Sequence, residues 1–180
     1  VNCINYKTQG VSLLYHHKSP KLGHCSFEYI YFLKGINEVN GVNVKSFREK
    51  ISEKLKIQCE SKFKNYKKDD ILVSGVPSSG IIYGETFSKE FGFPYSQFLN
   101  KRVDYPHRTF ILGSNDERLD ACKKKYIVTE NIEDKIIVLA DDSIVRGNTM
   151  KYLVRYLKSF NPREIHLVVG SPPVKNPCFY

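Results

Sequence analysis

The sequence of 180 residues lacks several features that would assign it to a class of protein at once. No stretch approaches the run of roughly 18 apolar residues that spans a bilayer, so we do not expect a membrane protein. The first residues also lack the apolar stretch of a signal peptide. An initiator methionine is missing as well, because the only methionine is Met150, and this indicates a truncated or processed end.

The spacing of the cysteines does not indicate a zinc site. The five cysteines are odd in number and widely separated, and they include no Cys-x-x-Cys pair. Reduced thiols are the default expectation for such a pattern, and we therefore predict a cytoplasmic protein.

Acidic residues are outnumbered by basic ones, which gives a formal net charge of +9. A basic chain can bind nucleic acid, an anionic surface or a polyanionic small molecule. The lysines are scattered, with short clusters at residues 62–68 and 123–125. We interpret these clusters as solvated surface, and nucleic acid is not an expected partner.

No repeat or low-complexity linker divides the sequence, and its length suits one domain with a real core. Three apolar runs, at residues 71–76, 135–140 and 165–170, have the length and β-branched content of buried strands. Apolar side chains then recur at helical spacing from Met150 to Phe160 and predict a helix between the last two strands. Strand, turn, helix and strand in this order form the unit of a parallel sheet.

A second unit of the same kind surrounds the first apolar run. We expect, in chain order, a strand at residues 27–32, a helix at residues 44–59 with Phe47, Ile51 and Leu55 on its apolar face, a turn at residues 77–80, a helix at residues 81–91 and an extended segment at residues 93–99. The predicted fold class is therefore α/β, with an open and mostly parallel sheet flanked by helices.

Two segments fall at the carboxyl ends of predicted strands, where open α/β sheets bind ligands. After one strand, Asp141 and Asp142 supply carboxylates for two ribose hydroxyls or a magnesium ion. Gly147 then allows close backbone approach at a helix start, where free amides favour a phosphate. The acidic pair has other interpretations, since two aspartates after a strand can also be turn and helix-cap residues that bind no ligand. Response regulators and phosphatases use similar pairs to bind magnesium.

The string Asp-Asp-Ser-Ile-Val-Arg-Gly at residues 141–147 resembles the phosphoribosyl-pyrophosphate signature of type I phosphoribosyltransferases. It is most similar to the signature of the amidophosphoribosyltransferases, which begin purine synthesis. Four further segments resemble the same family in the same order, at residues 25–32, 75–80, 108–111 and 171–173 with 177–180. The resemblance thus covers nearly the whole chain from about residue 20, and it implies the type I phosphoribosyltransferase fold with a small hood region.

What the resemblance implies is replacement of pyrophosphate by ammonia at the anomeric carbon of phosphoribosyl pyrophosphate, with Mg²⁺ as cofactor. Asp141 and Asp142 would hold the ribose hydroxyls and the magnesium, and Ser79 would help with the magnesium or the leaving group. Arg102 and Arg108 would close over the pyrophosphate. The other substrate-binding residues that it implies are Ser143, Ile144, Val145, Arg146, Gly147, Asn148, Thr149, Ser78, Gly80 and Lys101.

The sequence departs from the family pattern at several points. Ser78 replaces an acidic residue and Asn148 replaces a threonine, while the segment 100–108 is longer than usual with its Lys and Asn exchanged. The family also carries an N-terminal glutaminase half, so we expect residues 1–24 to be the junction with it and residues 25–180 to be the transferase domain. The end at Tyr180 falls within a motif, which favours a piece of a longer protein.

Partners follow from the same resemblance: phosphoribosyl pyrophosphate, ammonia or a glutaminase domain, and further copies in a homo-oligomer. Cys25 and Cys178 match two of the four cysteines that bind an iron–sulfur cluster in one branch of the family. Two ligands cannot hold such a cluster, so we expect it at most in a longer parent protein.

Two other functions stay open on the sequence alone. A non-catalytic regulator could bind phosphoribosyl pyrophosphate as a signal. Ser78 and the unusual segment 100–108 slightly favour this function. A salvage phosphoribosyltransferase would transfer the sugar to a nucleobase, which the acidic signature alone allows.

Overall fold

The computed structural model describes residues 2–5, 10–13, 23–102, 120, 123–145 and 147–173. Its strands are β1 (Asn2–Asn5), β2 (Gly10–Leu13), β3 (Glu38–Val39), β4 (Val42–Asn43), β5 (Ile71–Gly75), β6 (Leu99–Lys101), β7 (Tyr126–Val128), β8 (Ile136–Asp141) and β9 (Glu164–Val169). Its helices are η1 (Glu28–Phe32), α1 (Val44–Phe63), η2 (Lys68–Asp70), α2 (Ile81–Phe91) and α4 (Asn148–Lys158). Among the described residues, no helix is both long and apolar enough to cross a bilayer.

The centre of the fold is a parallel sheet in the order β5-β8-β9. All five residues from Ile136 to Ala140 are buried, as expected for a strand covered on both faces. On the other side of β5, Val73 bridges to Tyr95 in parallel, so the segment after α2 extends the sheet by one short pairing. β6 and β7 form a separate antiparallel pair.

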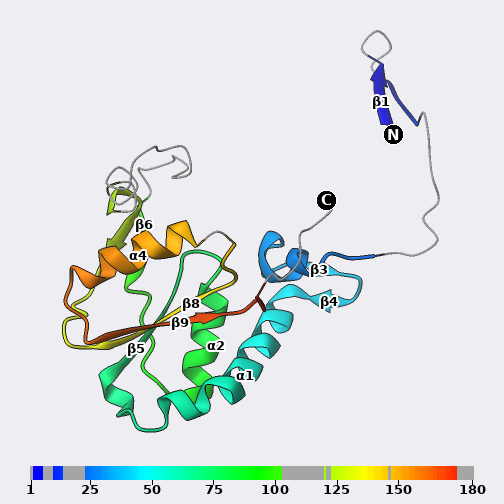
Figure 1. Cartoon of the computed structure of the whole chain (residues 1–180). Coiled ribbons are helices and arrows are strands. Elements are labelled where there is room, and N and C mark those ends of the chain that lie inside the picture. Colours follow the sequence, from blue (N-terminus) through cyan, green and yellow to red (C-terminus); the bar gives the residue numbers. More distant parts are fainter. Residues whose placement is uncertain are drawn as a thin grey trace.

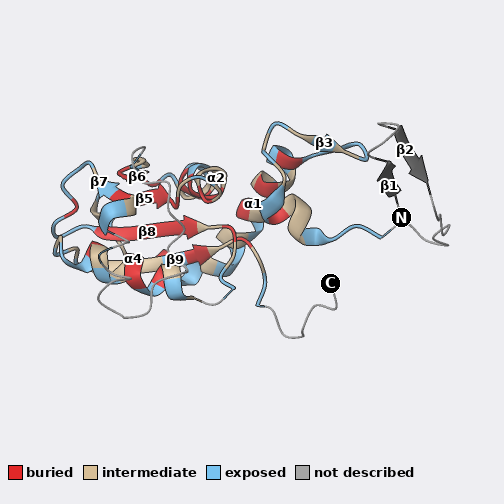
Figure 2. Cartoon of the chain, turned by 90° about the horizontal axis from the view of Figure 1, so that it is seen from above, coloured by how far each residue is buried: buried red, intermediate tan, exposed pale blue. Residues whose placement is uncertain are grey.

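Helices cover both faces of this sheet (Figure 1). Side chains alternate along β8, so Ile137 and Leu139 pack in a cluster with Leu153 of α4. Ile136 and Val138 pack on the opposite face with residues of α1 and α2. Figure 2 shows the buried strands between these two helical layers. The two layers cover the faces of the sheet and leave its carboxyl edge as the place for a site.

The chain leaves β5 and β8 in opposite directions. α2 leads from β5 to the pairing at Tyr95, whereas α4 leads from β8 to β9 on the far side. The strand order therefore reverses between β5 and β8. In open α/β sheets ligands bind at such a switch point, beyond the carboxyl ends of the two strands.

The predicted α/β class with a parallel sheet is confirmed, and its three strands and the helices at residues 81–91 and 148–158 lie within a few residues of their expected ends. The helix expected at residues 44–59 continues to Phe63. Its expected apolar residues Phe47, Ile51 and Leu55 are half-buried, while Val44, Arg48 and Ser52 are the side chains buried most deeply on it before Phe63.

The strand expected at residues 27–32 is wrong, because the structure forms the short π-helix η1 there. The expectation rested on the aromatic content of the segment, which favours strands. In the fold, side chains from other elements stabilise this helix instead. Arg48 donates to the carbonyl oxygens of Tyr29 and Leu33, and the Tyr83 hydroxyl donates to that of Ile30.

Candidate functional site

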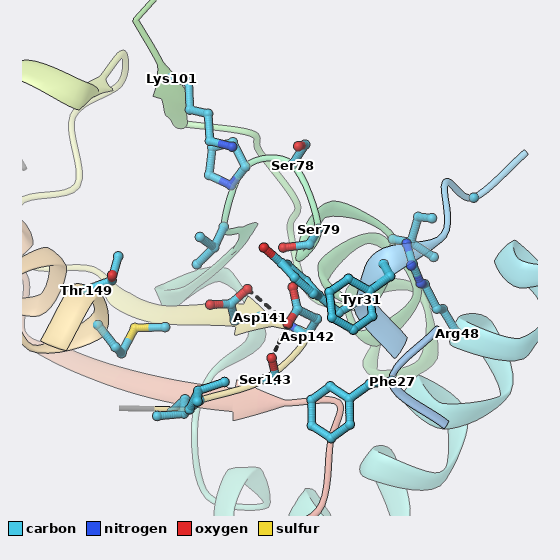
Figure 3. Close-up of a pocket in the computed structure, with 18 of the residues that line it drawn as sticks. Phe27, Tyr31, Arg48, Ser78, Ser79, Lys101, Asp141, Asp142, Ser143 and Thr149 are labelled. Atoms are coloured by element: carbon cyan, nitrogen blue, oxygen red, sulfur yellow. Dashed lines mark hydrogen bonds between the residues drawn. The ribbon is translucent and has the colours of Figure 1, made fainter. Parts of the chain in front are cut away.

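A cavity of about 1020 Å³ opens at the switch point between β5 and β8. Parts of the chain that are far apart in sequence meet around it (Figure 3). They are η1 with the residues after it, α1, the turn after β5, the antiparallel pair β6–β7, and the segment from β8 into α4. Its size suits a ligand as large as a phosphorylated sugar. Its described lining residues include Phe27, Tyr31, Lys34, Arg48, Pro77, Ser78, Ser79, Lys101, Lys125, Asp141, Asp142, Ser143, Ile144, Val145, Gly147, Asn148 and Thr149.

The turn after β5 is fixed by backbone contacts to β8. The N–H of Val76 donates to the carbonyl oxygen of Ala140 at 2.8 Å, and the N–H of Gly80 donates to that of Val76 at 2.8 Å. The peptide bond between Pro77 and Ser78 is cis. The turn predicted at residues 77–80 is confirmed, and it presents Ser78 and Ser79 to the cavity.

Asp141 and Asp142 follow each other at the end of β8 but have different surroundings. Asp142 is 3% exposed, and the Ser143 hydroxyl donates to its Oδ1. Oδ1 of Asp141 accepts a hydrogen bond from the N–H of Asp142 at 2.9 Å. Burial, with the neighbouring charge of Asp142, raises the pKa of Asp141 to about 7, against the opposing effects of that N–H, Ser79 and Lys101. Asp141 is therefore a carboxyl group that gains a proton easily while no cation is bound.

The segment from Ser143 to Thr149 supplies hydrogen-bond donors beside these carboxylates. Gly147 has φ +70°, in the left-handed region that favours glycine, and from there α4 begins without a side-chain cap. Its first backbone amides therefore lack partners within the helix, and Asn148 and Thr149 line the cavity beside them. This arrangement favours an anion such as a phosphate.

Basic side chains surround the cavity. Lys34, Arg48, Lys101 and Lys125 all line it, against the two carboxylates Asp141 and Asp142. The described lining thus carries more basic than acidic side chains, which suits a polyanionic ligand.

Sequence reasoning missed Arg48, Lys34 and Lys125 as residues of this cavity. Arg48 is 4% exposed, and its guanidinium donates to the carbonyl oxygens of Tyr29 at 2.9 Å and Leu33 at 2.7 Å. The available signal was its position on α1, where it stands one turn from the buried residues Val44 and Ser52. An arginine on a buried helix face needs such partners, because an unpaired buried charge is costly.

Most of the predicted site residues meet in this one cavity. Gly80 and Arg102 do not line it: Gly80 packs against the end of β8, and exposed Arg102 donates its backbone N–H to the carbonyl oxygen of Lys125. Arg108, Arg146 and Cys178 lie outside the described residues. Cys25 is an exposed thiol just before η1. The individual roles assigned to these residues stay predictions.

The donor set suits magnesium. Mg²⁺ prefers oxygen ligands and is commonly held by one or two carboxylates together with substrate phosphates. Asp141 and Asp142 provide such carboxylates in the cavity, and the hydroxyl of Ser79 lies beside them (Figure 3). Among the described residues, no cluster of three or more metal-binding side chains forms a closed cage.

Comparison with known proteins agrees with this geometry. Residues 46–170 match the family described as "Phosphoribosyl transferase domain", and the chain belongs to this family. The predicted type I phosphoribosyltransferase fold is thereby confirmed.

The predicted resemblance to amidophosphoribosyltransferases is confirmed too. The chain is 37% identical to the amidophosphoribosyltransferase of Methanocaldococcus jannaschii over 87% of its own length and 32% of the relative's. With that of Mycobacterium tuberculosis it shares 39% identity over 87% of this chain and 28% of the relative. A solved glutamine phosphoribosylpyrophosphate amidotransferase from B. subtilis, complexed with ADP and GMP, superimposes with a TM-score of 0.71 at 31% identity, over 99% of this chain and 37% of the other. The chain thus spans about a third of the length of these relatives.

Proposed function

We propose that the chain is the phosphoribosyltransferase domain of an amidophosphoribosyltransferase, which converts phosphoribosyl pyrophosphate and ammonia to phosphoribosylamine and pyrophosphate. The observation that carries this proposal is the meeting of Asp141, Asp142, the turn at residues 77–79 and the start of α4 in one cavity. The names of the sequence relatives support ammonia as the acceptor over a nucleobase. A similar solved structure is described as the allosteric regulatory enzyme of purine biosynthesis, which supports that pathway.

The site residues divide between the two ends of this substrate. The donors from Ser143 to Thr149 bind the 5-phosphate, and the carboxylates of Asp141 and Asp142 bind the ribose hydroxyls. Ser78, Ser79 and Lys101 bind the pyrophosphate. The ammonia nitrogen bonds to the anomeric carbon as the bond from that carbon to the pyrophosphate oxygen breaks. Positive charge develops on the sugar in the transition state, so fixed carboxylates nearby stabilise it and no protein nucleophile is needed.

Mg²⁺ is the proposed cofactor, held by Asp141 and Asp142 with help from Ser79. When bound, it neutralises charge on the phosphates of the substrate. Loading it requires Asp141 in the charged form. The raised pKa of Asp141 therefore couples metal binding to proton release.

The proposed partners follow from the relatives, which are about three times longer than this chain. Ammonia would come from a glutaminase domain or from solution, and a cytoplasmic homo-oligomer is the expected form. We propose no iron–sulfur cluster for this chain, since Cys25 and Cys178 would supply only two of the four cysteine ligands that such a cluster needs.

One observation favours a second candidate, a regulator that binds phosphoribosyl pyrophosphate without turnover. Ser78 is exposed at the cavity, and none of the residues from Pro77 to Gly80 carries a charge. A turn without a carboxylate offers no charged ligand to a metal ion on the leaving group, which limits catalysis more than binding.

The acceptor decides among these functions. The purified chain is incubated with phosphoribosyl pyrophosphate, Mg²⁺ and, in separate reactions, ammonium at about pH 8, adenine, guanine or orotate, and pyrophosphate release is measured. We expect the wild type to release pyrophosphate with ammonium and with none of the nucleobases. The Asp141→Asn variant should release none with any acceptor. Release with a nucleobase but not with ammonium would establish the salvage function instead. Binding with no release from any acceptor, together with salt-sensitive retention on a DNA column, would establish the regulator.

A further inference from the structure

Gln97 lies between the turn after β5 and the strand β6, and its side-chain amide is fully used. Its Nε2 donates to the carbonyl oxygen of Gly75 at 2.8 Å and to that of Leu99 at 2.6 Å. The hydroxyl of Tyr95 donates to its Oε1 at 2.6 Å. A glutamine amide has two N–H donors, so both are committed to backbone oxygens.

These two carbonyl oxygens belong to two different segments, each of which places a side chain in the cavity lining. Gly75 ends β5, directly before the turn that carries Ser78 and Ser79. Leu99 begins β6, whose last residue is Lys101. Both Ser79 and Lys101 line the cavity, and Figure 3 shows their segments on the same side of it.

β5 and β6 do not belong to one sheet in the described structure, because β6 pairs with β7 and β5 pairs with β8. No backbone ladder among the described residues therefore fixes β6 directly to the end of β5. The Gln97 amide makes that connection, with the bridge at Tyr95 and the burial of Leu99 beside it.

We propose that Gln97 is a positioning residue, which holds Lys101 and the turn at residues 77–79 in register so that together they bind the pyrophosphate end of the substrate. This inference rests on the proposed function. It assigns the effect to one end of the ligand, because the segment from Ser143 to Thr149 at the other end is held by β8 and α4. Loss of the amide should thus affect pyrophosphate and leave the 5-phosphate end unchanged.

The substitution Gln97→Glu tests this with little change of shape. A carboxylate has no N–H donor, so the oxygen that replaces Nε2 would face the carbonyl oxygens of both Gly75 and Leu99, and β6 would move away. We expect the affinity for inorganic pyrophosphate with Mg²⁺ to fall about tenfold in calorimetry, as for the loss of one or two hydrogen bonds. The affinity for ribose 5-phosphate should change less than about twofold. Gln58→Glu, on the exposed side of α1, is the matched control for the added charge and should bind both ligands as the wild type does.

Coupling to Lys101 gives a second readout that a purely structural role would not produce. If Gln97 acts partly through Lys101, the loss of pyrophosphate affinity in the double variant Gln97→Glu with Lys101→Met should be smaller than the sum of the two single losses. Fully additive losses would contradict the proposal. So would equal losses for pyrophosphate and ribose 5-phosphate.

Folding is checked by the Tm of each variant. Should Gln97→Glu fail to fold, Tyr95→Phe removes the hydroxyl that orients the amide, and a smaller loss, again confined to pyrophosphate, is expected. The two proposals fail differently. A wild type that binds neither ligand overturns the proposed function and this inference with it, whereas a wild type that binds both and a Gln97→Glu variant indistinguishable from it overturn the positioning role alone.

Discussion

Gly80 packs so tightly against β8 that a side-chain carbon on it would lie 2.2 Å from the carbonyl oxygen of Ala140. This contact joins the turn after β5 to the strand that carries Asp141. Only a residue without Cβ allows the two segments to approach so closely. Gly80 therefore contributes to the site by letting its two main segments meet, although it does not line the cavity.

Gly80→Ala should lower stability and separate these segments. The added methyl group meets backbone atoms, which cannot rotate away, so we expect a loss of about 2 kcal/mol. For a domain of this size the Tm should fall by about 4–8 °C. The measurement is a thermal melt followed by circular dichroism.

The control is Gly23→Ala, because an added Cβ there meets nothing within 4 Å. Its Tm should stay within about 1–2 °C of the wild-type value. Equal Tm values for Gly80→Ala and Gly23→Ala would show that the close contact with Ala140 does not contribute to stability.

Arg48→Met should destabilise η1, which carries Tyr31 of the cavity lining. Methionine retains most of the apolar stem but loses the hydrogen bonds to Tyr29 and Leu33, and each such bond from a charged donor contributes about 1.5–3 kcal/mol. We expect faster amide hydrogen exchange in a peptide covering residues 26–33. Exchange in β8 should change only by the global loss of stability.

Arg155→Met provides the comparison, since Arg155 is exposed on α4 and away from η1. It should leave the exchange of residues 26–33 unchanged. Unchanged exchange there in Arg48→Met would contradict the role given to the guanidinium.

Asp141→Asn should stabilise the protein at neutral and higher pH. The pKa of Asp141 is raised from an ordinary value of 3.8 to about 7, so between these values the folded state binds a proton that the unfolded state has released. Stability of the wild type thus falls as the pH rises through this window, whereas asparagine stays neutral. We expect the Tm of the variant to equal that of the wild type near pH ~4 and to exceed it by roughly 8–16 °C at pH ~8.

Thermal melts at intervals from about pH 4 to about pH 9 measure this difference. Asp120→Asn, at an exposed position, is the control and should show no such trend. A Tm difference for Asp141→Asn that shrinks as the pH rises would have the wrong sign and would contradict the assignment.

The sequence predicted well what depends on local pattern. A strand was expected at residues 135–140 because the apolar run there is continuous, and β8 forms at Ile136–Asp141. α4 was expected because Met150, Leu153 and Leu157 recur at helical spacing. The site segments followed, since both come directly after such strands. The resemblance to a known family then supplied roles for their residues.

What the sequence did not predict depends on partners far away along the chain. Residues 28–32 form a helix because Arg48 and Tyr83 donate to its carbonyl oxygens, and neither residue is near in sequence. The contact from Gln97 to Gly75 likewise spans two elements and leaves no trace in periodicity. Arg48 and Gln97 could be found only once the fold had brought these segments together.

The most direct test of the proposed function is a calorimetric titration of phosphoribosyl pyrophosphate with Mg²⁺ at about pH 8 into the wild type and into Asp141→Asn. We predict saturable binding by the wild type and at least about tenfold weaker binding by the variant, which melts at a higher temperature. A carboxylate that lowers stability but binds the ligand should show this combination of a higher Tm and a lower affinity when it is replaced. No binding by the wild type, or equal affinity in the two proteins, would contradict the proposal.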